Sequence, residues 1–387
     1  MHVLESYSTY CGLKIDRPFV LEKFFPLPVD KYITFQGISR TPSSNYNYWQ
    51  EVVNLIFPYL SSQGIAILQI GNREDKKIKN CVQTNGELNV NQLAYVTRRS
   101  LLHFGADSLP VHLASGRTKI VCLYPNTYAN QSKPYWSEDS EVSLIEPDRK
   151  GNKPFYFSED PSSVVNSITP ETIAKEILRL LNIPCDISHK SINFGEKYTP
   201  EISYDFVLNQ TITPKDTSAP ISLRLDYLFD EQSLIKQLNI CRSDIYTNKA
   251  IDKNILRSFK NKINHIYYMV GKDDQPDFVN EIKSLAIPFT LISFLTKEEV
   301  DAKKINYYDK GSLFKAKVPE QEKINKFKSL KNLYFRSNKI IASGGKTYPS
   351  KFHWDNKIEI NSFEFHPVVD YPAFWEDLEY FYLIQKP

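Results

Sequence analysis

Residues 105–115 read Gly-Ala-Asp-Ser-Leu-Pro-Val-His-Leu-Ala-Ser, and residues 119–124 read Lys-Ile-Val-Cys-Leu-Tyr. The second stretch is apolar and β-branched, which predicts a buried strand. The first stretch brings a carboxylate, a hydroxyl, a proline and an imidazole together directly after another apolar run at residues 101–104. Open α/β sheets bind ligands where a strand ends and a helix begins, so this stretch predicts both a fold and a binding site.

A structural explanation of the same residues is simpler. Asp107 or Ser108 would be the N-cap of a helix, Pro110 would occupy its first turn, and His112 would pack against a neighbour. The flanking segments decide between a ligand site and a capped helix.

The first half of the chain alternates between strand and helix patterns. Residues 125–160, rich in Pro, Ser, Asn and Asp, predict a loop. Such alternation is typical of a parallel sheet with crossover helices. Strands are predicted at residues 31–36, 65–70, 101–104 and 120–124, and helices at residues 49–60, 90–99 and 169–182.

A second series of the same kind follows residues 185–220, whose polar, proline-containing sequence predicts a linker or insertion. The segment from Asn332 onward is rich in aromatic residues, and we expect it to pack on the domains. In the second series strands are predicted at residues 221–227, 244–247, 265–270 and 288–293, and helices at residues 230–239, 252–262, 275–285 and 296–305.

These patterns predict an α/β fold with two Rossmann-like domains, in agreement with a length of 387 residues. The predicted boundaries are residues 1–184 for the first domain, 185–220 for the linker or insertion, 221–330 for the second domain and 331–387 for a C-terminal tail packed across the domains.

The composition is ordinary. With 48 Lys and Arg against 45 Asp and Glu, the net charge of +3 is not concentrated in a basic block, which argues against a dedicated nucleic-acid binder. The five cysteines are widely spaced and contain no CxxC pair, which indicates reduced thiols and neither a disulfide framework nor a zinc site. No signal sequence or membrane-spanning run is recognisable, so we expect a cytoplasmic chain.

Four features of the first half occur in a particular order. They are a strand ended by Gly37, a Ser/Thr loop before Trp49, a strand ended by Gly71, and the pattern Asp-Ser-x-Pro-x-His-x-Ala at residues 107–114. This order resembles the nucleotide-sugar-binding half of heptosyltransferase-type glycosyltransferases over residues 31–182. The resemblance implies the GT-B architecture, in which two Rossmann-like domains face each other across a cleft. In that family this half is C-terminal, so the resemblance also implies a permuted domain order.

The resemblance further implies a nucleotide-diphosphate sugar as co-substrate and no tightly bound cofactor. Metal-independent enzymes of this kind neutralise the diphosphate with backbone N–H groups, hydroxyls and a basic side chain, and Arg40 is the best local cation. The chain departs from the family motif at Leu109, where a small residue is usual. The residues that match donor-binding positions of the family are Gly37, Ser39, Arg40, Thr41, Gly71, Asp107, Ser108 and His112.

Transfer to a hydroxyl group needs a general base. In the resembled family a carboxylate follows the first strand of the acceptor domain, which implies Asp226 as the base here, with Asp230 as the second choice. Alternatively, Asp230 caps the helix that follows it, and Arg224 pairs with Asp226 or lies on the other side of the strand.

Two further motifs have structural explanations. Residues 272–274, Lys-Asp-Asp, predict a turn and a helix cap instead of a metal site. Residues 344–347, Gly-Gly-Lys-Thr, lack the first glycine of a phosphate-binding P-loop and predict a turn. No metal site is predicted.

The leading hypothesis is a metal-independent glycosyltransferase that moves a sugar from a nucleotide diphosphate to a hydroxyl of a carbohydrate or another acceptor. One alternative is a DNA-modifying glycosyltransferase that acts on a modified base, which the dispersed positive charge does not favour. Another is a non-catalytic binding protein with a degenerate transferase fold, motivated by Leu109. A sugar-nucleotide epimerase of the same architecture is the third.

Overall fold

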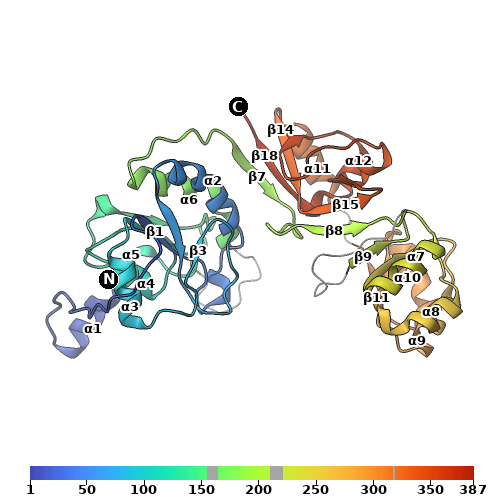
Figure 1. The fold of residues 1–387 in the computed structure, drawn as a ribbon, viewed down its shortest axis with the longest axis horizontal. Coiled ribbons are helices and arrows are strands. Elements are labelled where there is room, and N and C mark those ends of the chain that lie inside the picture. The colour runs from blue at the N-terminus through green and yellow to red at the C-terminus, as the bar shows by residue number, and fades with distance from the viewer. Residues whose placement is uncertain (155–163, 210–220, 317–318) are drawn as a thin grey trace. The chain divides into compact units, whose positions relative to one another are not determined.

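The computed structural model describes residues 1–154, 164–209, 221–316 and 319–387. The chain forms two compact units, Met1–Ser191 and Ile192–Pro387, here called the N-terminal and the C-terminal unit (Figure 1). Among the described residues, no helix has both the length and the apolar character needed to cross a membrane.

The N-terminal unit is built on a sheet of six parallel strands in the order β3-β2-β1-β4-β5-β6. This is the strand order of a doubly wound sheet, with β1 at the point where the chain changes direction. The strands are β1 (Tyr32–Gln36), β2 (Ala66–Gln69), β3 (Val82–Gln83), β4 (Leu102–Ala106), β5 (Lys119–Leu123) and β6 (Val142–Ile145).

Helices cover both faces of this sheet (Figure 1). The longer helices α2 (Trp49–Ser62) and α6 (Pro170–Leu180) contact each other on one face, and α3 (Val90–Arg98) and α4 (Leu109–Ala114) contact each other on the other face. The central strands are therefore buried at nearly every position, because successive residues point to opposite faces and both faces are covered. The remaining helices are α1 (Val3–Cys11), α5 (Ala129–Ser132) and the 3-10 turns η1 (Pro42–Ser44), η2 (Asp139–Glu141) and η3 (Val164–Ser167).

The four predicted strands of the first series are confirmed as β1, β2, β4 and β5. The prediction of an uninterrupted loop over residues 125–160 is wrong, because β6 lies within it and pairs with β5. All four β6 residues are only partly buried, as expected of an edge strand, so the apolar signal that marks the central strands is weak there. Residues 155–160 of that prediction lie outside the described residues.

The C-terminal unit contains an eight-stranded sheet in the order β13-β12-β11-β10-β9-β8-β15-β16. Its strands pair in parallel, except for the antiparallel hairpin β15-β16. From β9 to β13 the spatial order follows the chain order. The strands are β8 (Ser203–Phe206), β9 (Ile221–Arg224), β10 (Ser243–Thr247), β11 (Ile263–Met269), β12 (Phe289–Ser293), β13 (Leu313–Lys315), β15 (Lys339–Ser343) and β16 (Lys346–Tyr348).

The crossover helices between β9 and β13 pack into one apolar core with the strands. They confirm the predicted second series. These helices are α7 (Glu231–Ile240), α8 (Lys253–Phe259) with the 3-10 turn η4 (Lys260–Lys262), α9 (Pro276–Ser284) and α10 (Lys297–Tyr307).

The aromatic tail of the chain builds most of a second sheet in this unit, in the order β17-β14-β18-β7. Residues 185–209, within the predicted linker, carry β7 and β8, and residues 210–220 lie outside the described residues. Phe335, Phe374 and Phe381 centre the aromatic core of this sheet. Its elements are β7 (Lys190–Phe194), β14 (Leu333–Ser337), β17 (His366–Pro367), β18 (Phe381–Gln385), α11 (Gln321–Lys328), α12 (Lys351–Asp355), α13 (Pro372–Trp375) and the 3-10 turn η5 (Leu378–Tyr380).

Candidate functional site

The winding of the N-terminal sheet places two predicted segments side by side. Strand β1 pairs with β2 on one side and with β4 on the other, so the segments that follow β1 and β4 leave the sheet at its topological switch point. Ligands of doubly wound sheets bind in the crevice at this point, outside the carboxyl ends of the strands. The predicted residues of segments 37–41 and 107–112 follow these two strands directly.

The loop after β1 is held in a defined shape by its own polar groups. The Ser39 backbone N–H donates to Asn45 Oδ1 over 2.8 Å, and Ser39 Oγ donates to the Thr41 carbonyl over 3.1 Å. The Arg40 side chain is exposed. Gly37 is required beneath this loop, because a Cβ there would lie 2.8 Å from both the Phe35 and the Trp49 ring.

The segment after β4 reaches across the switch point. Ser108 is the N-cap residue of α4, but its hydroxyl does not cap the helix. Ser108 Oγ instead lies 3.1 Å from Gln36 Oε1 at the end of β1. Asp107 Oδ1 lies 3.5 Å from His112 Nε2, and Asp107 Oδ2 accepts from Ser132 Oγ over 3.2 Å. The predicted Asp107 and His112 are therefore paired, and the predicted Ser108 is joined separately to the end of β1.

Two glycines shape the carboxyl edge of this sheet. A Cβ on Gly105 would lie 2.0 Å from the Gln36 carbonyl oxygen, and the φ angle of +155° is one that L side chains rarely adopt. Gly105 thus permits the close approach of β1 and β4 at the switch point. The predicted Gly71 follows β2 in a turn where a Cβ would meet the Asp75 carboxylate at 2.2 Å.

Several polar residues of the site were missed by the sequence prediction. Gln36 and Ser132 contact the predicted residues directly, and Asn126 Nδ2 donates to Ser43 Oγ over 2.5 Å between the segments after β5 and β1. The position of Gln36 at the end of a predicted strand was the one available signal.

Arg149 is a cation at the same edge of the sheet, but its donors are engaged. Its Nη2 group donates to the carbonyls of Tyr124, Pro125 and Thr127 over 2.6, 3.2 and 3.0 Å, and its Nη1 group pairs with Glu146. Arg149 therefore fixes the loop after β5.

The charge of Asp107 acts on buried groups of β5 and the residue that follows it. Burial, with a smaller contribution from the Asp107 carboxylate, raises the pKa of the Cys122 thiol well above its usual value. Burial, together with Cys122 and Asp107, also raises the pKa of Tyr124. Both groups stay protonated at neutral pH, so Asp107 provides the negative charge of this cluster.

The two carboxylates predicted as a general base lie in the C-terminal unit. Asp226 follows β9, and its oxygens accept from Arg224 Nε and Nη2 over 2.8 and 2.6 Å. Arg224 also pairs with Asp205, and Lys339 Nζ lies 3.3 Å from Asp205 Oδ2. Asp226 is thus part of a buried network of charges, in which each of its two oxygens accepts one hydrogen bond from Arg224.

Asp230 is the N-cap of α7. Its Oδ1 accepts from the backbone N–H groups of Gln232 and Ser233 over 3.0 and 3.2 Å, and its Oδ2 accepts from Ser233 Oγ over 2.6 Å. The hydrogen bonds from the Ser233 side chain and backbone lower the pKa of the Asp230 carboxyl. A lowered pKa weakens a carboxylate as a base.

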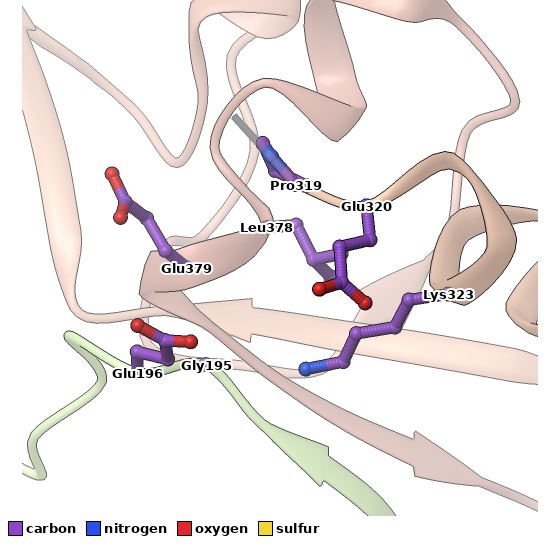
Figure 2. Close-up of a pocket in the computed structure, with 7 residues that line it drawn as sticks. All are labelled: Gly195, Glu196, Pro319, Glu320, Lys323, Leu378 and Glu379. Carbon is purple, nitrogen blue, oxygen red and sulfur yellow. The ribbon is translucent and has the colours of Figure 1, made fainter. Parts of the chain in front are cut away.

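A pocket of about 320 Å³ lies in the C-terminal unit, apart from every predicted residue (Figure 2). It gathers three glutamates and one lysine, and Glu379 Oε1 accepts from Lys197 Nζ over 2.9 Å. In the described part of the chain, no group of three His, Cys, Asp or Glu side chains is placed to hold a metal ion. The pocket is lined by Gly195, Glu196, Pro319, Glu320, Lys323, Leu378 and Glu379.

Comparison with known proteins gives similar structures but no similar sequences. No family model matches the chain, and no curated protein matches it. A glycosyl transferase family 9 protein from Veillonella parvula DSM 2008 is 17% identical, with 46% of this chain and 50% of that chain covered and a TM-score of 0.32. The ADP-heptose lps heptosyltransferase II of E. coli is 16% identical, with 46% and 51% covered and a TM-score of 0.32.

A third similar structure is the iron-containing dodecameric glycosyltransferase TibC from enterotoxigenic E. coli H10407. It is 16% identical, with 44% of this chain and 50% of that chain covered and a TM-score of 0.35. The chain spans about half the length of the solved structures it matches. These structures include heptosyltransferases, the family that the sequence motifs resemble.

Proposed function

We propose that the chain is a glycosyltransferase that transfers a sugar from a nucleotide diphosphate to an acceptor hydroxyl. One observation carries this proposal: at the switch point of a doubly wound parallel sheet, the loop of Ser39, Arg40 and Thr41 follows β1, and the segment with Ser108 and the Asp107–His112 pair follows the neighbouring β4. The donor would bind there, outside the carboxyl ends of β1 and β4.

The residue types at this edge suit a diphosphate donor. The Arg40 guanidinium and the hydroxyls of Ser39 and Thr41 would contact the phosphate oxygens, because planar donors and hydroxyls bind phosphate through directed hydrogen bonds. As the bond between sugar and phosphate breaks, negative charge grows on the phosphate, and donors fixed in advance stabilise it. Asp107 Oδ1, which lies 3.5 Å from His112 Nε2, would hold the imidazole in place.

The acceptor chemistry belongs, in this proposal, to the C-terminal unit. A carboxylate would take the proton from the attacking hydroxyl, with Asp226 the first candidate and Asp230 the second. Asp226 is held rigidly by Arg224, and Asp230 by Gln232 and Ser233, so either would act from a fixed position.

Donor binding tests the proposal. The full chain is titrated with UDP-, ADP-, GDP- and dTDP-sugars in a calorimeter, and its melting temperature is measured with each, because a ligand that binds only the folded state stabilises it. We expect one of these donors to bind, and His112→Ala or Arg40→Ala to weaken that binding at least tenfold.

Asp16→Ala is the matched control, because Asp16 is an exposed carboxylate on the N-terminal segment, outside the site. It should leave donor binding unchanged. Equal affinity of the wild type, His112→Ala and Arg40→Ala, or no binding of any nucleotide sugar, would refute the donor site.

A further inference from the structure

The eight-stranded sheet of the C-terminal unit has its crossover helices on one face. Strands β9 to β13 follow one another in space as in sequence, and right-handed crossovers between such strands all fall on the same side. The buried strand residues Leu223, Ile245, Ile266 and Leu291 pack in one core with α7, α8, α9 and α10. Parallel sheets are usually covered on both faces, so the second face needs its own explanation.

The second face from β10 to β13 presents partly exposed side chains, which we call the open sheet face. None of them belongs to a core cluster of the described residues, whereas their neighbours Ile245, Ile266 and Leu291 are fully buried on the helix side. The open sheet face consists of Asp244, Tyr246, His265, Tyr267, Thr290, Ile292 and Phe314, of which Phe314 is 58% exposed.

Register links these side chains into rows. Tyr246 pairs with Tyr267, and Tyr267 pairs with Thr290, so the three lie side by side across β10, β11 and β12. The Tyr246 and Tyr267 rings stack at 4.4 Å with an interplanar angle of 12°. His265 Nε2 lies 2.8 Å from Thr290 Oγ1, and the His265 ring lies 4.5 Å from the Tyr267 ring. The face therefore combines aromatic surface with hydroxyl and imidazole groups.

The tyrosine row ends at a part of the sheet that is covered. The Arg224 guanidinium lies 5.1 Å from the centre of the Tyr246 ring and 3.9 Å from that of Tyr227. The Tyr227 ring stacks on Trp354 of α12 at 5.3 Å. The open sheet face is thus bounded on the β9 side and continues to the exposed edge strand β13.

The charged and titratable groups of this face indicate which class of ligand it can bind. Burial lowers the pKa of His265, so the imidazole is mainly neutral near pH 7. Burial, with a contribution from Asp244, raises the pKa of Tyr267, so its phenol keeps its proton. Arg224 is neutralised by Asp205 and Asp226, and Arg242 donates to Asn264 beyond the start of β10.

Among the described residues, the Asp244 carboxylate and the exposed Arg242 guanidinium both bond to the Asn264 side chain, so these two opposite charges lie close together at the face. Single-stranded nucleic acids need a basic groove beside their stacking rings, and the open sheet face does not provide one. A lipid surface needs an apolar face rimmed by cations, which the hydroxyls, the imidazole and Asp244 do not provide. A neutral ligand with many hydroxyl groups matches both the charge and the hydrogen-bonding groups.

We propose that the open sheet face binds a neutral carbohydrate chain as the acceptor side of the transfer reaction. Because the Tyr246 and Tyr267 rings stack on each other, sugar C–H groups would lie against the edges of these rings, and sugar hydroxyls would bond to Thr290, His265 and Asp244. This inference rests on the proposed glycosyltransferase function.

An array of neutral oligosaccharides built from hexoses, deoxyhexoses and N-acetylhexosamines is probed with the labelled full chain, alongside heparin fragments and a ten-nucleotide dT strand. We expect saturable binding to a neutral oligosaccharide and at least tenfold weaker binding by Tyr267→Ala. Thr290→Tyr, which adds bulk at a partly exposed position, should also weaken it. Binding confined to heparin or dT, or no binding to the array, would overturn the inference.

The matched control is Tyr308→Ala, because Tyr308 is a tyrosine of the same unit that is 93% exposed at the end of α10. It should bind oligosaccharide like the wild type. If Tyr267→Ala and Thr290→Tyr both melt normally and also bind like the wild type, the open sheet face is not the site. Nucleotide-sugar affinity is measured on the same samples. If the wild type binds no nucleotide sugar, the donor proposal is refuted. If it binds a nucleotide sugar but no oligosaccharide, the carbohydrate site on the open sheet face is refuted.

Discussion

Replacing Gly105 by alanine tests whether the close contact of β1 and β4 shapes the switch point. The added Cβ would lie 2.0 Å from the Gln36 carbonyl oxygen, which belongs to the backbone and can yield only if the strands move apart. A strained φ costs about 1–3 kcal/mol. Overpacking in a tight core costs about 1–3 kcal/mol more. We therefore expect a loss of about 4 kcal/mol in the free energy of unfolding of the N-terminal unit.

Gly64→Ala is the matched control, since Gly64 also has a positive φ, of +64°, but a Cβ there has no atom within 4 Å. It should cost only the left-handed backbone penalty, about 1–2 kcal/mol. For a unit of this size each kcal/mol lowers the melting temperature by about 2–4 °C. Differential scanning calorimetry should show a drop of about 8–16 °C for Gly105→Ala and of about 2–8 °C for Gly64→Ala. Equal drops for the two variants would show that the strands do not depend on this contact.

Two further predictions concern buried and capping groups. Burial lowers the pKa of His103 to about 3, so stability of the N-terminal unit is fully present above pH 6.5 and should fall by up to about 1.4 kcal/mol per pH unit between pH 6.5 and about 3. Urea titrations at several pH values should show this slope, and His103→Gln should remove it. In the C-terminal unit, Asp226→Asn should cost about 3 kcal/mol, because it breaks a buried ion pair, whereas Asp230→Ala should cost about 1 kcal/mol for the lost cap. A larger cost for Asp230→Ala in thermal unfolding would contradict this, and a loss of turnover well beyond the stability loss would identify the base.

The central strands of the N-terminal unit could be predicted from the sequence because their residues are buried on both sides. Strands β1, β2, β4 and β5 are continuous apolar runs, which is the pattern that buried parallel strands leave. Strand β3 has two residues and β6 is partly exposed, so neither carries such a run. The cap at Asp230 was one of two predicted explanations, and its hydrogen bonds to the start of α7 match it.

The composition of the candidate site could be predicted only in part. The Asp107 and His112 pair is local, because Asp107 lies directly before the N-cap residue of α4 and His112 lies within this short helix. The contact of Ser108 with Gln36 spans 72 positions and exists only because β4 lies beside β1. Strand order is not encoded in the periodicity of any one segment. As an N-cap residue, Ser108 would be expected to bond to the start of α4 through its hydroxyl. In the structure this hydroxyl bonds to Gln36 instead.

Strand order also explains why the two units offer different surfaces to ligands. In the N-terminal unit the chain reverses its direction of winding at β1, which places the loops after β1 and β4 next to each other and covers both faces of the sheet with helices. In the C-terminal unit β9 to β13 wind in one direction, so no such reversal occurs there and one face keeps Tyr246 and Tyr267 partly exposed. Two adjacent loops at a strand edge suit a compact charged donor, and a row of rings and hydroxyls along a sheet suits an extended neutral chain. The proposed division into a donor unit and an acceptor unit agrees with this difference in winding order. Removing the positive charge at Arg40 should impair donor binding alone, and removing the aromatic ring at Tyr267 should impair oligosaccharide binding alone.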